Sequence, residues 1–424
     1  MYIHMLLDNC KTNQESLDLE RLNLSCGKKV LFILGVLWGE NGITTHLLTL
    51  SQGLQKLGWQ VGLVTKLANN SPQALQQSQR AMNIFQTSGV YCYQVDNLDA
   101  KLNVSSICNI FASIAQLHRI IDDFRPSIVH LHSLSISPYI YLLQKIHKFP
   151  YLSTCHMEPK SNRAGVKMST YFGRIVRSFL GDKIIAVSHM LRESFVKTLG
   201  VSQTKISLIP HGIDENYFQL PSLLERNEAR HQWGFSEKEK IICMIGRLAP
   251  EKGHVVLMRA LSSLRAEGLE INVLFAGQGY DDEEDNISLS ANHLGVEDLI
   301  HLVGYSDPRE VLWASDLIAL PSQPQTEAFA LVIAEAMLCG VVPIRTPGAG
   351  AIDQIEDGRN GYIIPFGDSE HLAKRLKEVF EDRKLLEEMS KLSFEKAQKD
   401  FTSKQMVNKT VNVYLDLIQT VGSF

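Results

Sequence analysis

One pattern recurs along the whole chain: a short run of β-branched and other apolar residues, followed by a longer segment with helical spacing. Residues 28–37 form the first run, and residues 42–57 then carry apolar side chains three and four positions apart. Strands that are apolar on both faces and alternate with helices predict parallel sheets covered on both sides. Further strands are expected at 60–65, 90–95, 127–132, 151–156, 183–188 and 205–209, with helices at 107–124 and 188–199.

The pattern pauses near residues 210–214, passes through a polar stretch at 222–240 and then starts again. The second set of strands is expected at 241–245, 271–276, 299–303, 317–320 and 341–344, with helices at 254–265, 308–313, 328–338 and 370–380. A chain of 424 residues is also too long for one ordinary domain.

We therefore predict an α/β protein with two Rossmann-like, doubly wound domains that face a cleft. Residues 1–27 would form an N-terminal extension and residues 28–212 the first domain. Residues 213–403 would form the second domain, and a closing amphipathic helix at about 404–424 would pack back on the first.

Composition excludes several classes of protein. Hydrophobic residues make up 45% and charged residues 21%, which excludes a disordered tail, a collagen and a coiled coil. No apolar run is long enough to span a bilayer, and the charged residues within 1–26 argue against a signal peptide. The 7 cysteines are scattered and lack the paired spacing of a zinc site, so we expect free thiols in a reducing cytoplasm.

Charge divides unevenly along the chain. Residues 1–212 contain 21 Lys and Arg against 12 Asp and Glu, whereas residues 213–424 contain 21 against 34. The basic half suits nucleic acid, an anionic membrane or a phosphate-bearing substrate, although ordinary solvated surface explains it equally well. No recognised nucleic-acid-binding module supports the first of these partners.

Two glutamates stand eight positions apart in the second half. Glu335 lies inside the apolar helix expected at 328–338, where a buried carboxylate is costly unless hydrogen-bond donors reach it. The hydroxyl pair of a ligand would supply donors, and so would a backbone or basic group of the core. Glu327 precedes the same helix, whose first backbone N–H groups, at residues 328–330, are able to hold a phosphate.

A basic loop follows the strand expected at 241–245. Its sequence is Gly246-Arg247-Leu248-Ala249-Pro250-Glu251-Lys252-Gly253. A strand, a basic loop and a helix in this order are typical of the carboxyl edge of a parallel sheet, where ligands bind. Arg247 and Lys252 would supply two cations for a diphosphate, whereas two solvated surface cations are the plainer interpretation.

The first half offers weaker features. Gly39 and Gly42 stand in the loop after the first strand and let the backbone approach a ligand, but the third glycine of a dinucleotide fingerprint is missing. His156 ends an expected strand, where it would meet a reacting hydroxyl or be a satisfied core histidine. His130 and His132 share a strand face and are interpreted as structural, since no third ligand stands at metal spacing.

Together these motifs resemble the retaining glycosyltransferases of the GT-B fold, in the glycosyltransferase group 1 family (family 4). Residues 246–253 are similar to that family's G-R-x-x-x-E-K-G, and residues 321–340 to its P-S-x-x-E-x-F-G-x-x-x-x-E-A-M-x-x-G. Residues 209–214 are similar to I-P-N-G-[IV]-D, with His211 in place of the asparagine. The resemblance covers most of the chain and is strongest from about residue 183 to residue 367.

The resemblance implies a hexosyltransferase-type enzyme (EC 2.4) that moves a sugar from a nucleotide diphosphate-sugar to a hydroxyl acceptor. It implies catalytic roles for His156, near the transferred sugar, and for Glu327, near the anomeric carbon. The donor-binding residues that it implies are Gly42, Arg247 and Lys252 for the diphosphate, Gly304 and Tyr305 for the nucleobase, Phe329 and Ala330 for the sugar, and Glu335 for the ribose. No cofactor and no metal are expected.

The chain departs from the family pattern at three glycines. Asn41 replaces the first of two adjacent glycines, the second of which is Gly42, and Ala328 and Ala330 replace the glycines on either side of Phe329. The added methyl groups imply less space around the donor sugar.

A basic segment at residues 160–183 has apolar residues between its 6 Lys and Arg. Such a segment could rest on an anionic membrane surface or turn a solvated face outward from the core. We expect a glycan or lipid-linked oligosaccharide acceptor, used in surface polysaccharide or glycoconjugate synthesis at the inner face of the membrane. The alternatives are a GT-B nucleotide-sugar 2-epimerase and a non-catalytic nucleotide-sugar-binding protein.

Overall fold

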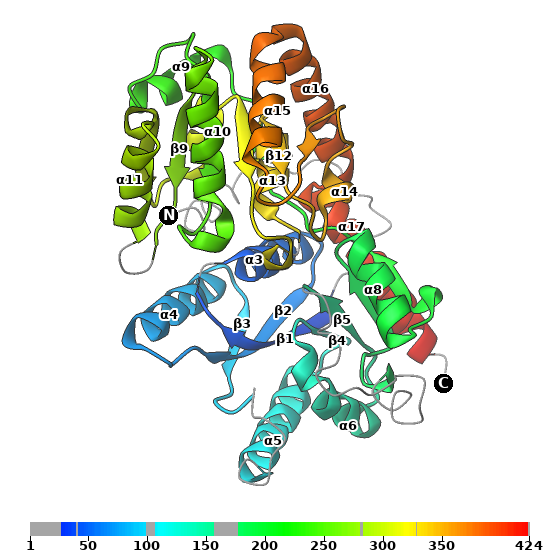
Figure 1. Cartoon of the computed structure of the whole chain (residues 1–424). Coiled ribbons are helices and arrows are strands. Elements are labelled where there is room, and N and C mark those ends of the chain that lie inside the picture. The colour runs from blue at the N-terminus through cyan, green and yellow to red at the C-terminus, as the bar shows by residue number, and fades with distance from the viewer. Residues whose placement is uncertain are drawn as a thin grey trace. The chain divides into compact units, whose positions relative to one another are not determined.

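The computed structural model describes residues 27–39, 41–98, 107–156, 177–279, 283–327 and 329–422. The chain divides into two compact units (Figure 1). Among the described residues, the C-terminal unit comprises Ile213–Thr402, and the N-terminal unit comprises those from Gly27 to Gly212 together with the segment from Ser403 onward. The expected N-terminal extension, apart from Gly27, and the basic segment up to residue 176 lie outside the described residues.

The N-terminal unit is built on a seven-stranded parallel sheet, among the residues that the structure describes, with the order β3-β2-β1-β4-β5-β6-β7. Strand β1 is apolar on both faces and pairs with both β2 and β4, so the strand order reverses there. The strands are β1 (Lys29–Leu37), β2 (Gln60–Leu67), β3 (Tyr91–Gln94), β4 (Ile128–Leu131), β5 (Tyr151–Cys155), β6 (Lys183–Ala186) and β7 (Ile206–Leu208).

Local signals start and stop the helices of this unit. Ser71 caps α4 with Pro72 in its first turn, and Ser188 caps α8, which ends at the left-handed Gly200. The helices are α3 (Gly42–Lys56), α4 (Pro72–Thr87), α5 (Ile107–Phe124), α6 (Ser137–His147), α8 (His189–Leu199) and α17 (Ser403–Gly422).

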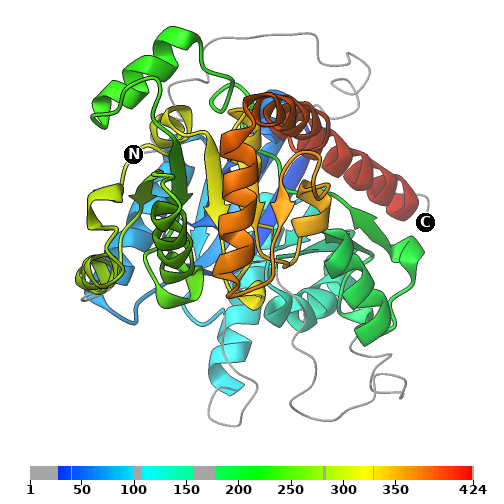
Figure 2. The same cartoon turned by 45° about the horizontal axis from the view of Figure 1, so that its top comes forward.

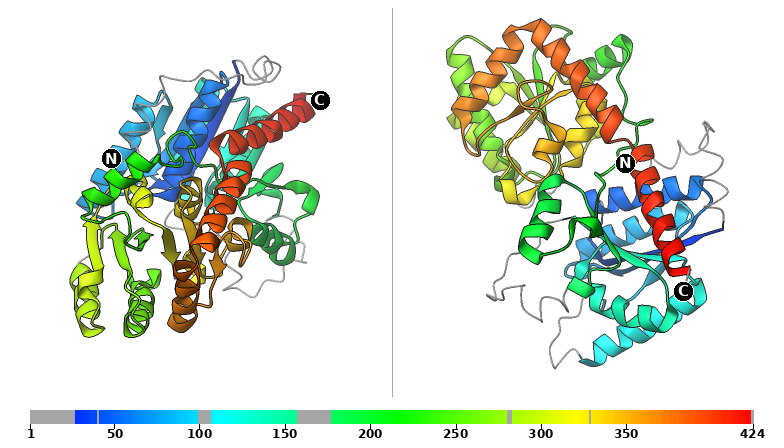
Figure 3. Two further views of the ribbon diagram at one scale, coloured as in Figure 1. Left: turned by 90° about the horizontal axis from the view of Figure 1, so that it is seen from above. Right: turned by 90° about the vertical axis from the view of Figure 1, so that its right-hand side faces the viewer.

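The C-terminal helix α17 packs against α3, as Figure 3 shows. The two helices approach closely because Gly53 has no side chain: a Cβ there would lie 2.3 Å from Val407 Cγ2. Farther along α17, the Tyr414 ring lies 5.4 Å from that of Trp59.

The C-terminal unit repeats the design, with the strand order β10-β9-β8-β11-β12-β13 among its described residues. Helices α10, α11 and α15 share one apolar core with the sheet, and Figure 2 shows α15 lying along it. The strands are β8 (Ile241–Ile245), β9 (Asn272–Ala276), β10 (Ile300–Gly304), β11 (Leu317–Leu320), β12 (Val342–Arg345) and β13 (Tyr362–Ile363). The helices are α9 (Leu223–Gln232), α10 (His254–Ala266), α11 (Glu283–His293), α12 (Pro308–Ala314), α13 (Leu331–Leu338), α14 (Ala351–Gln354), α15 (Ser369–Glu381) and α16 (Arg383–Asp400).

The predicted α/β fold with two doubly wound sheets is confirmed, and each expected strand is present to within two residues. The polar stretch at 222–240 nevertheless contains α9, which begins with a capping box between Ser222 and Glu225. The helix expected at 328–338 begins only at Leu331. Helices α4, α6, α14 and α16 and strand β13 were not expected.

No helix in the described part of the chain is both long enough and apolar enough to cross a bilayer. The cysteines whose surroundings the structure describes are free thiols, as expected: Cys92, Cys108, Cys155, Cys243 and Cys339.

Candidate functional site

Two loops meet at the carboxyl edge of the C-terminal sheet, after the neighbouring strands β8 and β11. The Gln323 N–H donates to the Glu251 carbonyl oxygen at 2.8 Å and so joins the loops. At Gly253, with φ +87°, a Cβ would lie 2.3 Å from the Pro321 oxygen, so only glycine permits this approach.

An ion pair bridges the two loops. Lys252 Nζ lies 2.6 Å from Glu327 Oε1, with the two side chains only 18% and 12% exposed. Because both charges are largely withdrawn from water, each depends on the other for stabilisation. The structure therefore brings together two of the residues predicted from separate motifs.

Arg247 lies in the same basic loop but is half-exposed. Its Nη2 forms an ion pair with Glu251 Oε1 at 2.5 Å. An exposed pair of this kind is worth little to stability, so the guanidinium can change partner at small cost.

Glu335 is buried in the middle of α13, and no other described residue donates a hydrogen bond to its carboxylate. Burial raises the pKa of this carboxyl to about 8. The side chain therefore holds its proton at neutral pH until a donor group reaches it.

The loop before α13 differs from the sequence expectation. Because the helix begins at Leu331, its first-turn N–H groups belong to residues 331 and 332, whereas the sequence analysis placed the helix start at residue 328. The Phe329 side chain is buried with its ring 5.5 Å from that of Phe401, so only its backbone can face a ligand. Ala330 takes left-handed dihedral angles, φ 53° and ψ 76°, which glycine would adopt without strain.

Two buried polar residues that the sequence analysis missed hold this loop. The Gln354 amide donates to the carbonyl oxygens of Phe329, at 2.6 Å, and Ala330, at 3.1 Å. Arg345 Nη1 in turn donates to the Gln354 oxygen at 2.5 Å. This chain of hydrogen bonds compensates for the strained dihedral angles at Ala330.

Arg345 is 1% exposed at the carboxyl end of β12. Burial lowers the pKa of its guanidinium to about 10, while the carboxylates of Glu327 and Asp353 oppose that shift. Its Nε has no hydrogen-bond partner. A polar residue directly after an apolar strand was the available sequence signal, because the carboxyl ends of parallel strands form the ligand edge.

Gly304 ends strand β10 and Tyr305 follows it; in the sheet, β9 separates β10 from β8. Gly304 has φ +61°, and Tyr305 is 56% exposed. The phenol ring is thus open to solvent at the carboxyl edge of its strand.

A hollow of about 480 Å³ lies at the opposite edge of this sheet, beside residues that precede β8 and β11. Its Arg226 and Arg230 are both paired with Asp316, at 2.6 and 2.9 Å. We interpret this hollow as structural because its arginines are already paired and it lies away from the basic loop.

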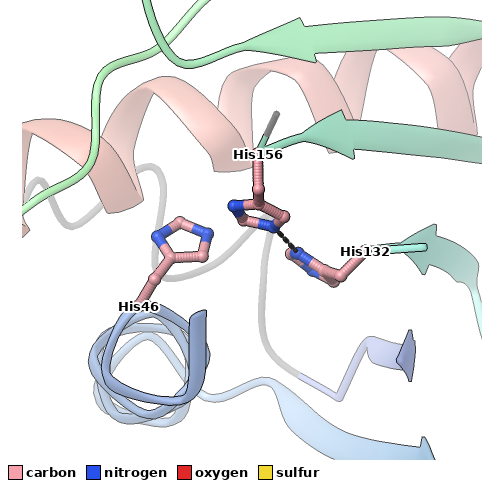
Figure 4. A group of neighbouring side chains, drawn as sticks. All are labelled: His46, His132 and His156. Atoms are coloured by element: carbon pink, nitrogen blue, oxygen red, sulfur yellow. Dashed lines mark hydrogen bonds between the residues drawn. The ribbon is translucent and has the colours of Figure 1, made fainter. Parts of the chain in front are cut away.

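The carboxyl edge of the N-terminal sheet carries buried histidines (Figure 4). His132 follows β4, His156 follows β5 and His46 lies on α3. His132 Nδ1 and His156 Nε2 are 3.0 Å apart and share one hydrogen bond. His46 Nδ1 lies 2.9 Å from His211 Nδ1.

Burial lowers the pKa of each ring in this group, that of His156 to about 4 and those of the others well below the usual range. His130 has both nitrogens satisfied, by Tyr414 at 2.5 Å and Thr154 at 2.6 Å. The structural interpretation therefore fits His130. At His132 the structure brings two further histidines close, His46 from α3 and His156 from the end of β5, which spacing along the sequence did not indicate.

Gly42 begins α3, but its surroundings differ from the family pattern. The Asn41 side-chain oxygen accepts from the N–H groups of Ile43, at 2.9 Å, and Thr44, at 3.1 Å. The residue that replaces a glycine thus occupies two of the donors that the helix start would otherwise offer.

Two family models match the chain, one over each unit. The model described as "Glycosyl transferases group 1" matches residues 225–396, and "Glycosyltransferase Family 4" matches residues 40–217. The chain belongs to the group 1 glycosyl transferases. The resemblance seen in its motifs is thereby confirmed.

The chain is 29% identical over 240 residues to N-acetyl-alpha-D-glucosaminyl L-malate synthase from Bacillus anthracis, a match that covers 56% of this chain and 60% of the relative. It is 24% identical to UDP-Gal:alpha-D-GlcNAc-diphosphoundecaprenol alpha-1,3-galactosyltransferase from Escherichia coli, over 74% of this chain and 82% of the relative. The matches span about half to two thirds of the length of the first curated relatives.

The fold of this glycosyltransferase is similar to that of Anabaena HepE in complex with UDP-glucose. The TM-score is 0.70 at 19% identity, and the match covers 93% of this chain and 100% of the other. At this identity the likeness shows the fold alone, which is the predicted GT-B fold.

Proposed function

We propose that this glycosyltransferase moves a hexose from a nucleotide diphosphate-sugar to a hydroxyl acceptor, with retention of the anomeric configuration. The observation that carries the proposal is the shielded Lys252–Glu327 ion pair, close to the buried guanidinium of Arg345. A departing diphosphate is best stabilised by cations that are already in place and withdrawn from water.

In the proposed mechanism the diphosphate takes the place of the carboxylate partners of the two loop cations. Lys252 turns from Glu327 to the phosphate oxygens, and Arg247 turns from Glu251. Glu327 is then released to accept a hydrogen bond from the donor sugar. Since positive charge gathers on the leaving group, the bond from the sugar to the diphosphate breaks more easily.

Glu335 is the proposed ribose contact. Its carboxyl is protonated before binding, because burial raises its pKa to about 8. Two ribose hydroxyls would supply the donors that the buried carboxylate lacks, and its proton would leave. Gly304 and Tyr305 are proposed to lie by the nucleobase, with the exposed ring of Tyr305 stacking on it.

In the N-terminal unit, His156 is proposed to face the transferred sugar. Its Nδ1 is buried without a hydrogen-bond partner, while Nε2 is held by His132. This arrangement fixes the ring and leaves one nitrogen for a hydroxyl. Gly42 is proposed to approach the diphosphate through its own N–H, since Asn41 occupies the next two donors.

Lys252→Ala tests the proposal. We expect kcat/KM for nucleotide release to fall by about 100-fold or more, as when a preorganised donor is lost. The matched control is Lys238→Ala, which removes an exposed lysine of the same unit and should leave turnover unchanged. Wild-type turnover in Lys252→Ala would refute the diphosphate role.

Lys252→Ala leaves the Glu327 carboxylate buried without its cation, which could unfold the unit. The double variant Lys252→Met with Glu327→Gln removes both charges and avoids that penalty. It should melt close to the wild type and still lack turnover.

The proposed donor is a UDP-hexose. UDP-glucose is bound in the Anabaena HepE structure, and UDP-Gal stands in the name of the Escherichia coli relative. Thermal shifts measured with UDP-, GDP- and ADP-sugars should show the largest stabilisation with a UDP-sugar. A larger shift with GDP- or ADP-sugars would overturn the choice of nucleobase.

The proposed acceptor is a lipid-linked glycan at the cytoplasmic face of a membrane, in surface polysaccharide synthesis. Support comes from the diphosphoundecaprenol acceptor in the name of that relative and from the basic composition of residues 160–183. Pelleting with anionic liposomes, lost at high salt, is the expected result. Failure to pellet at low salt would remove the membrane part of the proposal.

Product analysis separates transfer from the alternatives. Incubation without an acceptor should yield no new nucleotide-sugar, whereas an epimerase would produce one. The anomeric configuration of the first product, read by NMR, tests retention.

A further inference from the structure

We propose that His46, His132 and His156 form a binding site for one divalent transition-metal ion, of the Zn²⁺ class, in the N-terminal unit. The site goes beyond the proposed transferase activity. It can be measured on the free chain without donor or acceptor, so its failure and that of the transferase are separable.

Geometry is the first argument. One ring nitrogen of each of the three histidines lies within 4.8 Å of the other two, and all three residues are buried. Figure 4 shows the rings gathered between α3 and the ends of two strands. Since α3 and the two strands belong to one packed unit, the ligands are held by a rigid frame and not by one mobile loop.

Proton counting is the second argument. His132 Nδ1 and His156 Nε2 face each other at 3.0 Å, so one of them carries the shared proton and the other offers a lone pair. A tetrahedral Zn²⁺ holds its nitrogens at about 2.0–2.1 Å, which places them roughly 3.4 Å apart. The ion can therefore take the place of that proton with little movement, while the proton moves to the other nitrogen of the same ring and His46 shifts by on the order of 1 Å.

Unsatisfied nitrogens are the third argument. His46 Nε2, His132 Nε2 and His156 Nδ1 are buried and have no hydrogen-bond partner. A buried polar atom without a partner is costly, so three in one cluster require an explanation. A metal ion would use the His46 Nε2 lone pair directly, and its bonds to His132 Nδ1 and His156 Nε2 would leave a proton on the other nitrogen of each of those two rings.

The supporting contacts are those of a metal site. His211 forms a hydrogen bond with His46 Nδ1 and so orients Nε2 of the His46 imidazole. In metal sites, hydrogen-bonding residues behind the ligands orient them in the same way. Burial keeps the three rings neutral, which is the form that binds metal. Three imidazoles suit Zn²⁺, Cu²⁺ or Ni²⁺ and leave one coordination position open.

The test is titration of the full chain with Co²⁺ as a visible-absorption probe and with Zn²⁺ by calorimetry. We expect one equivalent to bind, with the intense visible bands of low-coordinate Co²⁺. A stoichiometry near zero, or the weak bands of hexa-aqua Co²⁺ alone, would overturn the proposal.

Variants assign the ligands. His46→Gln and His132→Gln should each weaken binding by more than 100-fold, and His211→Gln by about 10–100-fold, as expected for a supporting residue. Each variant is first checked for an unchanged melting temperature. If one of them unfolds, the remaining single variants decide the ligand set.

The surface pair His118–His147 provides the matched control. Its ring nitrogens, His118 Nδ1 and His147 Nε2, lie 2.6 Å apart, but the pair is exposed and lacks a third histidine in the described part of the chain. His118→Gln should bind Co²⁺ like the wild type. Loss of binding in His118→Gln, or wild-type binding in both His46→Gln and His132→Gln, would place the metal elsewhere.

Discussion

The two units share one strand order but place opposite chemistry at the carboxyl edges of their sheets. The carboxyl edge of the C-terminal sheet holds charged side chains that are largely withdrawn from water: Lys252, Glu327 and Arg345. The N-terminal edge holds neutral imidazoles, whose burial keeps them unprotonated. A departing diphosphate needs the first environment, and an incoming neutral hydroxyl is compatible with the second.

The comparison also separates net charge from site charge. Residues 213–424 carry 34 Asp and Glu against 21 Lys and Arg, yet this acidic half holds the buried cations. Net charge mostly counts solvated side chains, which are screened by salt. A few groups withdrawn from water decide where an anion binds.

The largest expected effect lies at the charged edge. Glu327→Gln should lower kcat by about 100- to 1000-fold, because Lys252 loses its buried partner and the sugar loses an acceptor. Steady-state nucleotide release measures this change. An equal loss of kcat in the surface control His118→Gln would show that the loss is not specific to the Lys252–Glu327 pair.

Donor binding should depend on pH through Glu335. The carboxyl has a pKa of about 8 in the free chain and must lose its proton to accept the ribose hydroxyls. Affinity for UDP should therefore rise by up to about tenfold per pH unit from pH 6 to 8 and level off above. Calorimetry at three pH values tests this, and Glu335→Gln should remove the slope. A slope that survives in Glu335→Gln would assign the titration to another group.

Zn²⁺ should affect only the histidines at the carboxyl edge of the N-terminal sheet, and not the charged residues of the C-terminal unit. Zn²⁺ on His156 Nε2 keeps the proton of that ring on Nδ1, which can then no longer accept a hydroxyl proton, so transfer should slow by about tenfold or more at saturation. A chelator should restore the rate, and UDP affinity should stay unchanged. If Zn²⁺ inhibits His132→Gln as strongly as the wild type, the inhibition does not arise at the histidine site.

The smallest expected effect concerns backbone strain. Ala330→Gly removes the strain of the left-handed dihedral angles but increases the conformational entropy of the unfolded chain. The net change in unfolding free energy should therefore stay within about 1 kcal/mol. Ala334→Gly, four residues on and inside the same helix, should destabilise by at least about 1 kcal/mol. Denaturant unfolding measures both variants. An equal loss in the two would mean that Ala330 is unstrained.

Much of the fold was predictable because periodicity reports burial directly. Strands such as β8 and β11 are continuous apolar runs, and their predicted bounds match the structure. Helix α9 was missed because only Ala229 and Arg230 in it are buried, so no apolar stripe marks it. Its capping box between Ser222 and Glu225 was the usable signal.

The candidate site was only partly predictable. Lys252 and Glu327 were found because each stands in a motif, and the structure shows their side chains in contact. Arg345 has no motif, and its importance follows from burial, which sequence spacing does not report. His46 lies far along the chain from His156, and only the packing of α3 against the sheet brings the two together.

The return of α17 to the N-terminal unit has a consequence for biosynthesis. Tyr414 supplies the partner of His130 Nδ1, and Val407 fills the space beside Gly53. The N-terminal unit therefore leaves the ribosome first but can complete its packing only with α17, which is translated after the whole C-terminal unit. A premature stop codon just before residue 403 would leave the C-terminal unit complete and remove helix α17 from the N-terminal unit.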